Sequence, residues 1–238
     1  MVKKGDFIEI VYTGRIKESG KVFDTNDSVV ANKEGLKSDT KPIVVCVGEN
    51  DVVKGLDSSF EGKKEKDSYS VDVNAENGFG KKDAKQYKLV PASVFKGEMH
   101  PVPGLQVTFQ NGSSGVIKTV SGGRILVDFN HPLAGHELSY DVKIEKIITD
   151  DAEKLKGFLN YYLGAEGEVE INEGKAVIKG MKDVHELMQK AVVEKALKRI
   201  PSLKAIEFFK EEKKEEAKEE AKKEESKAAE KKAPVKKA

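Results

Sequence analysis

The chain contains one cysteine and no tryptophan among its 238 residues. A single thiol cannot build a disulfide framework, and Cys46 lies in the apolar run IVVCVG, which predicts a small buried side chain rather than a nucleophile. Proteins that do without disulfides are typical of reducing compartments. We therefore expect a cytoplasmic protein.

Long apolar runs are also missing from the sequence. A helix needs roughly 18 to 20 successive apolar residues to cross a bilayer, and no stretch of this chain comes near that length. The first residues, MVKKGDFIE, lack the apolar segment of a signal peptide. We expect neither export nor a membrane partner.

An excess of charge of one sign is absent as well. The 42 lysines and arginines nearly balance the 41 aspartates and glutamates, so the formal net charge is +1. Because no strong field of one sign is expected around the chain, nucleic acid is not an expected partner.

Motifs for metal, nucleotide or nucleophilic chemistry are not found. No spacing typical of metal ligands relates the four histidines, which are His100, His131, His136 and His185. The sequence contains no G-x-x-x-x-G-K-[ST] loop and no G-x-S-x-G elbow. We predict no metal site and no cofactor.

Apolar and polar residues alternate in the first part of the chain, which predicts strands with one wet face. Residues 6–17 place Ile8, Ile10 and Tyr12 on one side. A turn at KESG then leads to a short second strand near Phe23. The polar, turn-rich residues 26–41 predict a long loop.

Further along, the run KPIVVCVG is strand-like, and residues 68–73 and 138–145 again alternate. A short helix is predicted in ENDVVKGLDSSFEG, with Asn50 or Asp51 as N-cap and Gly62 as terminator. Its apolar residues recur at helical spacing: Val52, Val53, Leu56 and Phe60.

The segment between the two alternating strands is too long for a structureless loop in a compact domain. It contains three β-rich runs divided by NGSSG and SGG, both of which are hairpin signals. The sequence therefore predicts a small β domain inserted into a loop of the first domain.

After residue 149 the pattern becomes that of an α-β-β-α-β unit. The first helix carries a stripe at helical spacing: Leu155, Phe158, Leu159 and Tyr162. A hairpin follows across NEG, and then a second helix over residues 183–199, with one face made of Val184, Leu187, Met188 and Ala191. From residue 210 the chain is almost entirely Lys, Glu and Ala, which indicates either disorder or a solvated helix.

Four blocks of sequence, in this order, resemble the FKBP-type peptidyl-prolyl cis-trans isomerases. They are VYTGRIKESGKVFDTN, KPIVVCVGENDVVKGLDSSFEG, NAENGFGKKDA and NHPLAGHELSYDVKIEKI. The insertion resembles the insert-in-flap domain of the SlyD-like branch, and the whole layout resembles the long archaeal type.

The resemblance implies an α+β fold, in which an FKBP-like antiparallel sheet wraps around a short helix. The resemblance also implies two further domains, which are an inserted small β domain and a C-terminal α/β sandwich-like domain. The expected boundaries are 1–83 and 132–149 for the FKBP domain, 84–131 for the insert, 150–209 for the C-terminal domain and 210–238 for the charged tail.

The resemblance also implies a proline-binding pocket. Its residues are Tyr12, Phe23, Asp24, Ile43, Val52, Val53, Leu56, Phe79 and Tyr140, with Leu133 and Ala134 at the rim. The resemblance implies that the Asp24 carboxylate forms a hydrogen bond with Tyr12 and does not carry a proton. It also implies that the backbone N–H of Val53 donates a hydrogen bond to a substrate carbonyl. Leu56 and Ile43 stand where better-known members have tryptophan and phenylalanine, which argues against tight macrolide binding.

The implied activity is isomerisation of X-Pro bonds in unfolded or proline-containing polypeptides. The insert is implied to hold these clients through apolar residues: Val90, Phe95, Met99, Val102, Leu105 and Val107. On the residues alone, these side chains serve equally well as the core of the insert. A peptide-binding module with little catalysis is the alternative function, and residues 150–209 either form a homodimer or dock onto the first domain.

Overall fold

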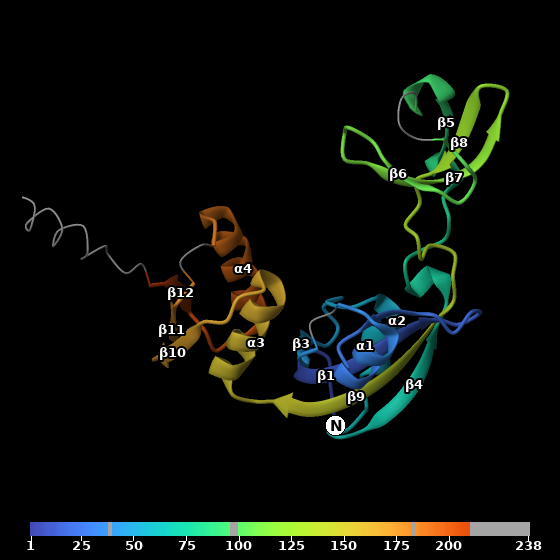
Figure 1. Cartoon of the computed structure of the whole chain (residues 1–238). Helices are drawn as coiled ribbons and strands as arrows, with labels where there is room; N and C mark the ends of the chain where they lie inside the picture. Colours follow the sequence, from blue (N-terminus) through green and yellow to red (C-terminus); the bar gives the residue numbers. More distant parts are fainter. Residues whose placement is uncertain (38–39, 96–99, 182–183, 210–238) are drawn as a thin grey trace, which may run out of the picture. The chain divides into compact units, whose positions relative to one another are not determined.

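The computed structural model describes residues 1–37, 40–95, 100–181 and 184–209 (Figure 1). The chain divides into two compact units, Met1–Asp150 and Asp151–Ala238, and each is described by itself. Within the described residues no helix is long and apolar enough to span a membrane. Met99 and the charged tail, 210–238, lie outside the described residues.

A curved antiparallel sheet of five strands forms the base of the first unit. The strands are β1 (Phe7–Ile16), β2 (Val22–Thr25), β3 (Ile43–Cys46), β4 (Ser68–Val73) and β9 (Leu138–Ile148). Their order is β2-β1-β9-β4, and β3 also pairs with β1. The alternation predicted for β9 is confirmed, because Tyr140, Val142 and Ile144 are buried while Asp141 and Lys143 between them are exposed.

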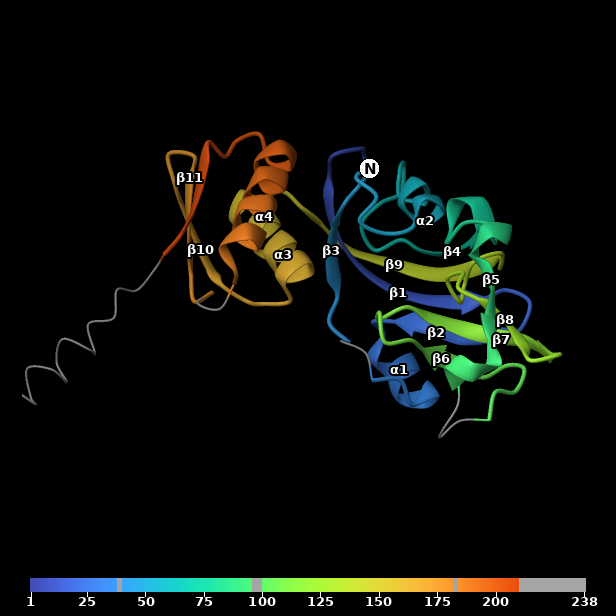
Figure 2. The same cartoon turned by 90° about the horizontal axis from the view of Figure 1, so that it is seen from above.

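The short helix α2 (Lys54–Ser59) lies in the hollow of this sheet (Figures 1 and 2). Leu56 and Phe60 are almost completely buried, at 1% and 0% exposure. The helix begins later than predicted, with Val53 as its N-cap. The Asp51 carboxylate instead accepts a hydrogen bond from the Cys46 N–H at 2.9 Å, so it fixes the preceding loop and does not cap the helix.

The predicted loop over residues 26–41 is wrong in part, because it contains helix α1 (Ser28–Glu34). Asp27 caps this helix by accepting hydrogen bonds from the backbone N–H groups of Val29 and Val30. Only Ala31 of the helix is buried, so the apolar period that would predict a helix is not present. The capping aspartate was the available signal.

The insertion between β4 and β9 forms a sheet of its own. Its strands are β5 (Tyr87–Pro91), β6 (Gln106–Thr108), β7 (Ser114–Ser121) and β8 (Arg124–Asp128), in the order β5-β8-β7-β6. Gly122 and Gly123, with φ of 56° and 76°, form the two-residue turn between β7 and β8. Two positive φ values are the requirement of a type I′ hairpin turn, so the SGG signal is confirmed.

Short 3-10 helices precede and follow β5, η2 (Ala84–Gln86) and η3 (Ala92–Phe95), while η1 (Ala75–Asn77) directly follows β4. The core of the inserted sheet is made of Val107, Ile117, Ile125 and Val127, each at most 4% exposed. Four buried residues are few for an independent core. The insert therefore depends on partly buried aromatic side chains packed around it, among them Phe95, Phe109 and Phe129.

The second unit contains α3 (Asp151–Leu163), β10 (Glu168–Asn172), β11 (Lys175–Lys179), α4 (Glu186–Arg199) and β12 (Ala205–Phe208). The strands form a sheet in the order β10-β11-β12, in which β11 and β12 are parallel. Both helices lie on one side of this sheet (Figure 2). The predicted stripe of α3 is confirmed, because Leu155, Phe158 and Leu159 are buried.

Helix α4 packs with a different face from the one predicted. Its buried residues are Val192 and Ala196, whereas Leu187 and Met188 are 70% and 52% exposed. Besides the predicted row, the helix carries Val192 and Ala196 four residues apart, and the sequence period does not say which of these two apolar rows is buried. The row containing Leu187 is the one left in solvent.

Asp57 fixes α2 to the loop before it, and its removal is expected to destabilise the fold. The buried carboxylate accepts the backbone N–H groups of Gly48 and Asn50 at 2.9 and 3.1 Å. Because Asp57→Ala leaves both donors without this acceptor, we expect the free energy of unfolding to fall by roughly 2 to 4 kcal/mol. Denaturant unfolding measures this, with the exposed Glu61→Ala as control. Equal stability of the two variants would contradict the role of Asp57.

Candidate functional site

Four aromatic rings from separate segments of the first unit meet in one cluster. The Phe23 ring lies edge-on to those of Phe79 and Tyr140, with centroids 6.1 and 5.9 Å apart. The Tyr12 and Tyr140 rings are 6.3 Å apart. The four predicted aromatic residues of the pocket, carried by β1, β2, β9 and the segment after η1, are therefore brought together.

Gly14 allows this cluster to form. A Cβ at this position would lie 2.6 Å from Cζ of Phe23 and 2.9 Å from Cε1 of Tyr140, closer than side chains tolerate. The residue pairs with Tyr140 across β1 and β9 and with Asp24 across β1 and β2. The sequence analysis missed this glycine. The only available signal was a glycine inside a strand pattern, which often marks a close approach.

Asp24 makes the hydrogen bond that the family resemblance implied. The Tyr12 hydroxyl donates to its carboxylate at 2.7 Å. Asn26, which is buried, holds the strand behind this pair: its side-chain oxygen accepts the Tyr12 N–H at 2.6 Å, and its amide donates to the Ile10 carbonyl at 3.0 Å. The carboxylate of Asp24 is thereby kept at the exposed edge of the cluster.

Tyr140 places a neutral phenol in the cluster. The residue is 3% exposed, and burial, followed by the negative charge of Asp24, raises the pKa of its hydroxyl well above the usual range. Among the described residues this hydroxyl makes no hydrogen bond. A buried hydroxyl without a protein partner is suited to bond a ligand.

Helix α2 offers a second donor. Val53 is its N-cap, and its carbonyl accepts the N–H groups of Leu56 and Asp57. The N–H of Val53 itself donates to no described residue. The first N–H groups of a helix have no partner inside the helix, so this one is available to a carbonyl oxygen.

The other predicted pocket residues lie on neighbouring segments. Ile43 pairs with Ile10, two positions before Tyr12, and Val52 directly precedes Val53. Leu133 is half-buried and Ala134 is 3% exposed, in the turn that leads into β9.

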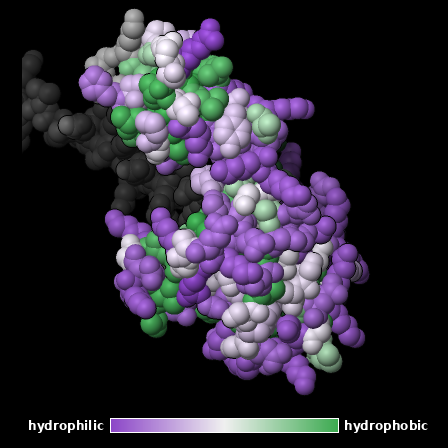
Figure 3. Space-filling view, turned by 90° about the vertical axis from the view of Figure 1, so that its right-hand side faces the viewer, coloured by the Kyte–Doolittle hydropathy of each residue, from purple (hydrophilic) through white to green (hydrophobic). Residues whose placement is uncertain are grey.

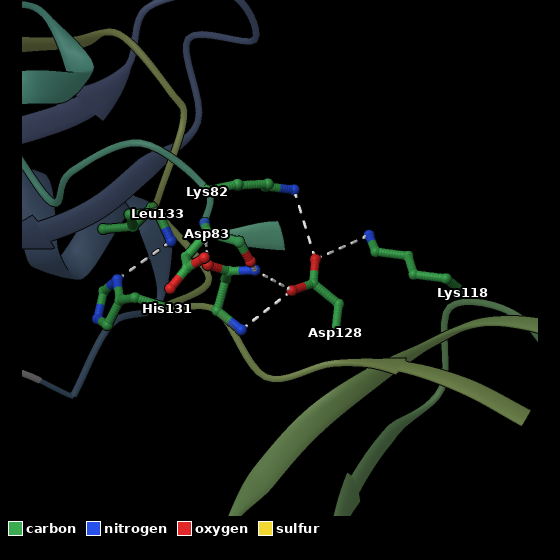
Figure 4. A network of polar contacts seen from close by, with 7 residues as sticks. Lys82, Asp83, Lys118, Asp128, His131 and Leu133 are labelled. Carbon is green, nitrogen blue, oxygen red and sulfur yellow. Dashed lines mark hydrogen bonds and ion pairs between the residues drawn. The ribbon is translucent and has the colours of Figure 1, made fainter. Parts of the chain in front are cut away.

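His131 also touches the cluster, and the sequence analysis missed it as a pocket residue. Its imidazole lies parallel to the Phe79 ring, with an interplanar angle of 4° and centroids 4.5 Å apart. Its Nδ1 accepts the Leu133 N–H at 3.2 Å (Figure 4). The only sequence signal was a histidine before a proline in the chain returning from the insert.

The insert carries an apolar groove of about 660 Å³. Its lining includes Leu89, Val90, Val94, Phe109 and Phe129. Leu89 and Val94 are 63% and 57% exposed, and apolar side chains interrupt the hydrophilic surface of the insert in Figure 3.

The predicted client-binding residues are divided by the structure. Val90 lines the groove, and Val102 is exposed elsewhere at 53%. Val107 belongs to the core of the insert, with Phe95 and Leu105 packed against it. Val107 is therefore corrected to a core residue, because a side chain only 4% exposed cannot hold a client.

The cluster offers an apolar binding surface and hydrogen-bond donors. In the part of the chain that the structure describes, no group of three or more His, Cys, Asp or Glu side chains is placed to hold a metal ion. Tyr140 and Val53 provide donors for carbonyl oxygens. The rings provide an apolar surface in the same part of the first unit.

Two family profiles match the chain. The family described as FKBP-type peptidyl-prolyl cis-trans isomerase matches residues 1–100, and that described as FKBP26, IF domain, matches residues 88–133. The N-terminal domain of FKBP42 from Arabidopsis thaliana is a similar solved structure, with a TM-score of 0.34 and 16% identity, covering 62% of this chain and 76% of that one.

Curated relatives agree with these profiles. The short-type peptidyl-prolyl cis-trans isomerase of Methanocaldococcus jannaschii is 26% identical over 157 residues, covering 64% of this chain and 98% of the relative. SlyD of Yersinia pestis is 28% identical, covering 56% of this chain and 68% of the relative. A probable FKBP-type 16 kDa isomerase of Pseudomonas fluorescens is 32% identical, covering 44% of this chain and 73% of the relative. The chain belongs to the FKBP-type peptidyl-prolyl cis-trans isomerases.

Proposed function

We propose that this protein is a folding isomerase that accelerates X-Pro rotation in unfolded or partly folded chains, which its insert holds. The observation that carries the proposal is the meeting of four aromatic rings over Gly14, with the neutral hydroxyl of Tyr140 among them. The rings provide a pocket for proline, and the groove of the insert provides a separate surface for the client chain.

The rotation itself requires no covalent chemistry. The barrier about an amide bond is about 18 to 20 kcal/mol, and the trans form of X-Pro is favoured by only about 0.5 to 1 kcal/mol. Amide resonance separates charge between nitrogen and oxygen, and twisting about the C–N bond abolishes that separation. Water stabilises the planar, dipolar state more than the twisted one.

An apolar pocket stabilises the twisted imide more than the planar one, which is the opposite of the effect of water. Phe23, Phe79 and Tyr140 exclude water from the imide, which stabilises the twisted state relative to the planar one. An acceleration of order 10⁵ corresponds to about 7 kcal/mol, because each 1.36 kcal/mol gives a factor of ten. Exclusion of water, selection of a twisted shape and one or two hydrogen bonds are together sufficient for this.

The polar groups of the site orient the substrate. The Val53 N–H and the Tyr140 hydroxyl are donors for carbonyl oxygens on either side of the proline. Asp24 holds Tyr12, which packs beside Tyr140. In this scheme Asp24 is an orienting residue and transfers no proton.

The insert supports the second part of the proposal. Leu89 and Val94 expose large apolar side chains beside the groove, and exposed apolar patches on a folded protein often mark a binding surface. An unfolded chain held there is tethered to the same molecule as the pocket. Its prolines then meet the pocket at a raised effective concentration.

Substitutions of the pocket residues test whether the pocket accelerates isomerisation. We expect Phe23→Ala or Tyr140→Ala to lower kcat/KM on an Ala-Leu-Pro-Phe peptide by about 100-fold, because a wall of the dry pocket is removed. Asp24→Ala removes one orienting hydrogen bond and is expected to lower it about fivefold. Protease-coupled or NMR exchange measurements give these rates, with Lys21→Ala as the exposed control.

Equal rates for all four variants would contradict the pocket mechanism. If the wild type binds the peptide without accelerating exchange, the protein is a peptide-binding module instead.

The rate is also expected to be nearly independent of pH between about pH 6 and pH 9. Burial and the Asp24 charge raise the pKa of Tyr140, so its phenol stays protonated, and remains a donor, throughout this range. No other group has to gain or lose a proton in the mechanism. A rate that follows the titration of a single carboxylate or imidazole would contradict it, and NMR exchange rates on the same peptide provide the measurement.

Substitutions in the groove are expected to affect protein clients but not short peptides. We expect Leu89→Ser with Val94→Ser to slow proline-limited refolding of an unfolded client at least tenfold, because client binding is lost while the pocket is untouched. The rate on a short peptide should not change. Val120→Ser is the matched control, since Val120 is 42% exposed on the same domain but does not line the groove. Equal refolding rates with both variants would contradict client holding by the groove.

A further inference from the structure

His131 contacts the pocket wall from the chain that returns from the insert. Its imidazole stacks on Phe79 with centroids 4.5 Å apart, while the edge contact between Phe79 and Phe23 has a centroid distance of 6.1 Å. Phe79 is thus supported by a ring on one face and contacts the pocket cluster through Phe23. Its orientation depends on both neighbours, because a phenylalanine side chain has no polar group to anchor it.

Two sets of hydrogen bonds join the two linkers of the insert next to this stack. Towards the sheet, the Gly135 N–H donates to the Gly80 carbonyl at 2.8 Å. Towards the insert, the Asn130 side chain accepts the Asp83 N–H at 2.8 Å and donates to the Asp83 carbonyl at 3.1 Å. Gly80 directly follows Phe79 and Asn130 directly precedes His131, so these bonds join the two linkers next to both rings.

Asp128 in turn holds Asn130. Its carboxylate accepts the Asn130 N–H at 3.0 Å and the Asn130 side-chain amide at 2.7 Å, with Lys82 and Lys118 each 3.7 Å away (Figure 4). Burial alone would raise the pKa of this carboxyl, but hydrogen bonds from Asn130 and Tyr87 and the positive charge of Lys82 together outweigh burial and lower it. A charged Asp128 therefore anchors the segment that carries His131.

The imidazole has two separable contacts. One is the stack on Phe79, and the other is the hydrogen bond in which Nδ1 accepts the Leu133 N–H at 3.2 Å. The second contact closes a local turn. An asparagine at this position can close the same turn, because its side-chain oxygen accepts a hydrogen bond from the backbone N–H two residues further along the chain. The first contact needs a ring.

We propose that His131 is a positioning residue for proline binding, because its stacked ring holds Phe79 as a wall of the pocket. This inference rests on the proposed function in assigning Phe79 to the pocket. An aromatic pair contributes enough to change an equilibrium by a factor of about 2 to 10. The contact is made whether the bound imide is planar or twisted, so it acts mainly on KM and peptide affinity.

Three substitutions in the full-length protein test this assignment. His131→Ala removes the ring and the acceptor, His131→Asn keeps the acceptor without the ring, and His131→Phe keeps the ring without the acceptor. The measurements are kcat and KM on the X-Pro peptide, peptide Kd by calorimetry, and Tm for each variant.

We expect KM and Kd to rise about fivefold in the Ala and Asn variants and to stay within twofold of wild type in the Phe variant. The value of kcat should change less than twofold in all three. The inference is overturned if all variants match wild type, or if Asn restores affinity and Phe does not, because the turn alone would then explain the residue.

The two proposals fail in different ways. If the wild type binds the peptide but does not accelerate exchange, the isomerase function is wrong, and the order of Kd values still tests His131. If the wild type is active and the Phe variant loses affinity like the Ala variant at unchanged Tm, the isomerase function stands and the stacking role is wrong.

Discussion

The pairing of β1 with β9 is the interaction on which the site depends. Its register runs from Phe7 opposite Ile148 to Ile16 opposite Leu138, and joins the beginning and the end of the first unit. It places Gly14 beside Tyr140, which is the close approach that lets the aromatic rings meet. It also leaves β9 free to pair with β4 on its other edge. A shift of one residue would turn Tyr140 to the opposite face of the sheet and remove the pocket.

The same pairing explains why an insertion is tolerated between β4 and β9. Val73 and Leu138 are opposite each other at the end of the ladder, so the chain can leave and return at neighbouring points. Loop-closure entropy grows slowly with length, and the insert packs a small buried cluster around Ile117 and Ile125 with partly buried side chains against it. An added domain therefore leaves the geometry of the catalytic sheet unchanged.

Much of the first unit could be predicted, because its strands have one wet face and alternate regularly. The bond between Tyr12 and Asp24 was implied by the family resemblance rather than by alternation, and it is present between the paired strands β1 and β2. The predictions that were wrong concern residues whose burial depends on tertiary contacts. Alternation within the insert did not reveal that Val107 faces its core while Leu89 faces solvent. Helix α4 had two apolar rows, and Leu187 lies on the row that does not pack.

His131 shows most clearly which site residues could not be predicted from the sequence. Its stack on Phe79 joins residues far apart in sequence, which become neighbours only when the linkers pair through Gly80 and Gly135. The linker segments begin and end at the aromatic cluster, and they carry the insert, which we propose holds a client. A substrate ring needs a wall that keeps its position, because a bound proline loses its contact if the wall rotates away. If His131 fixes that wall, the segment that returns from the insert is part of the proposed proline-binding site.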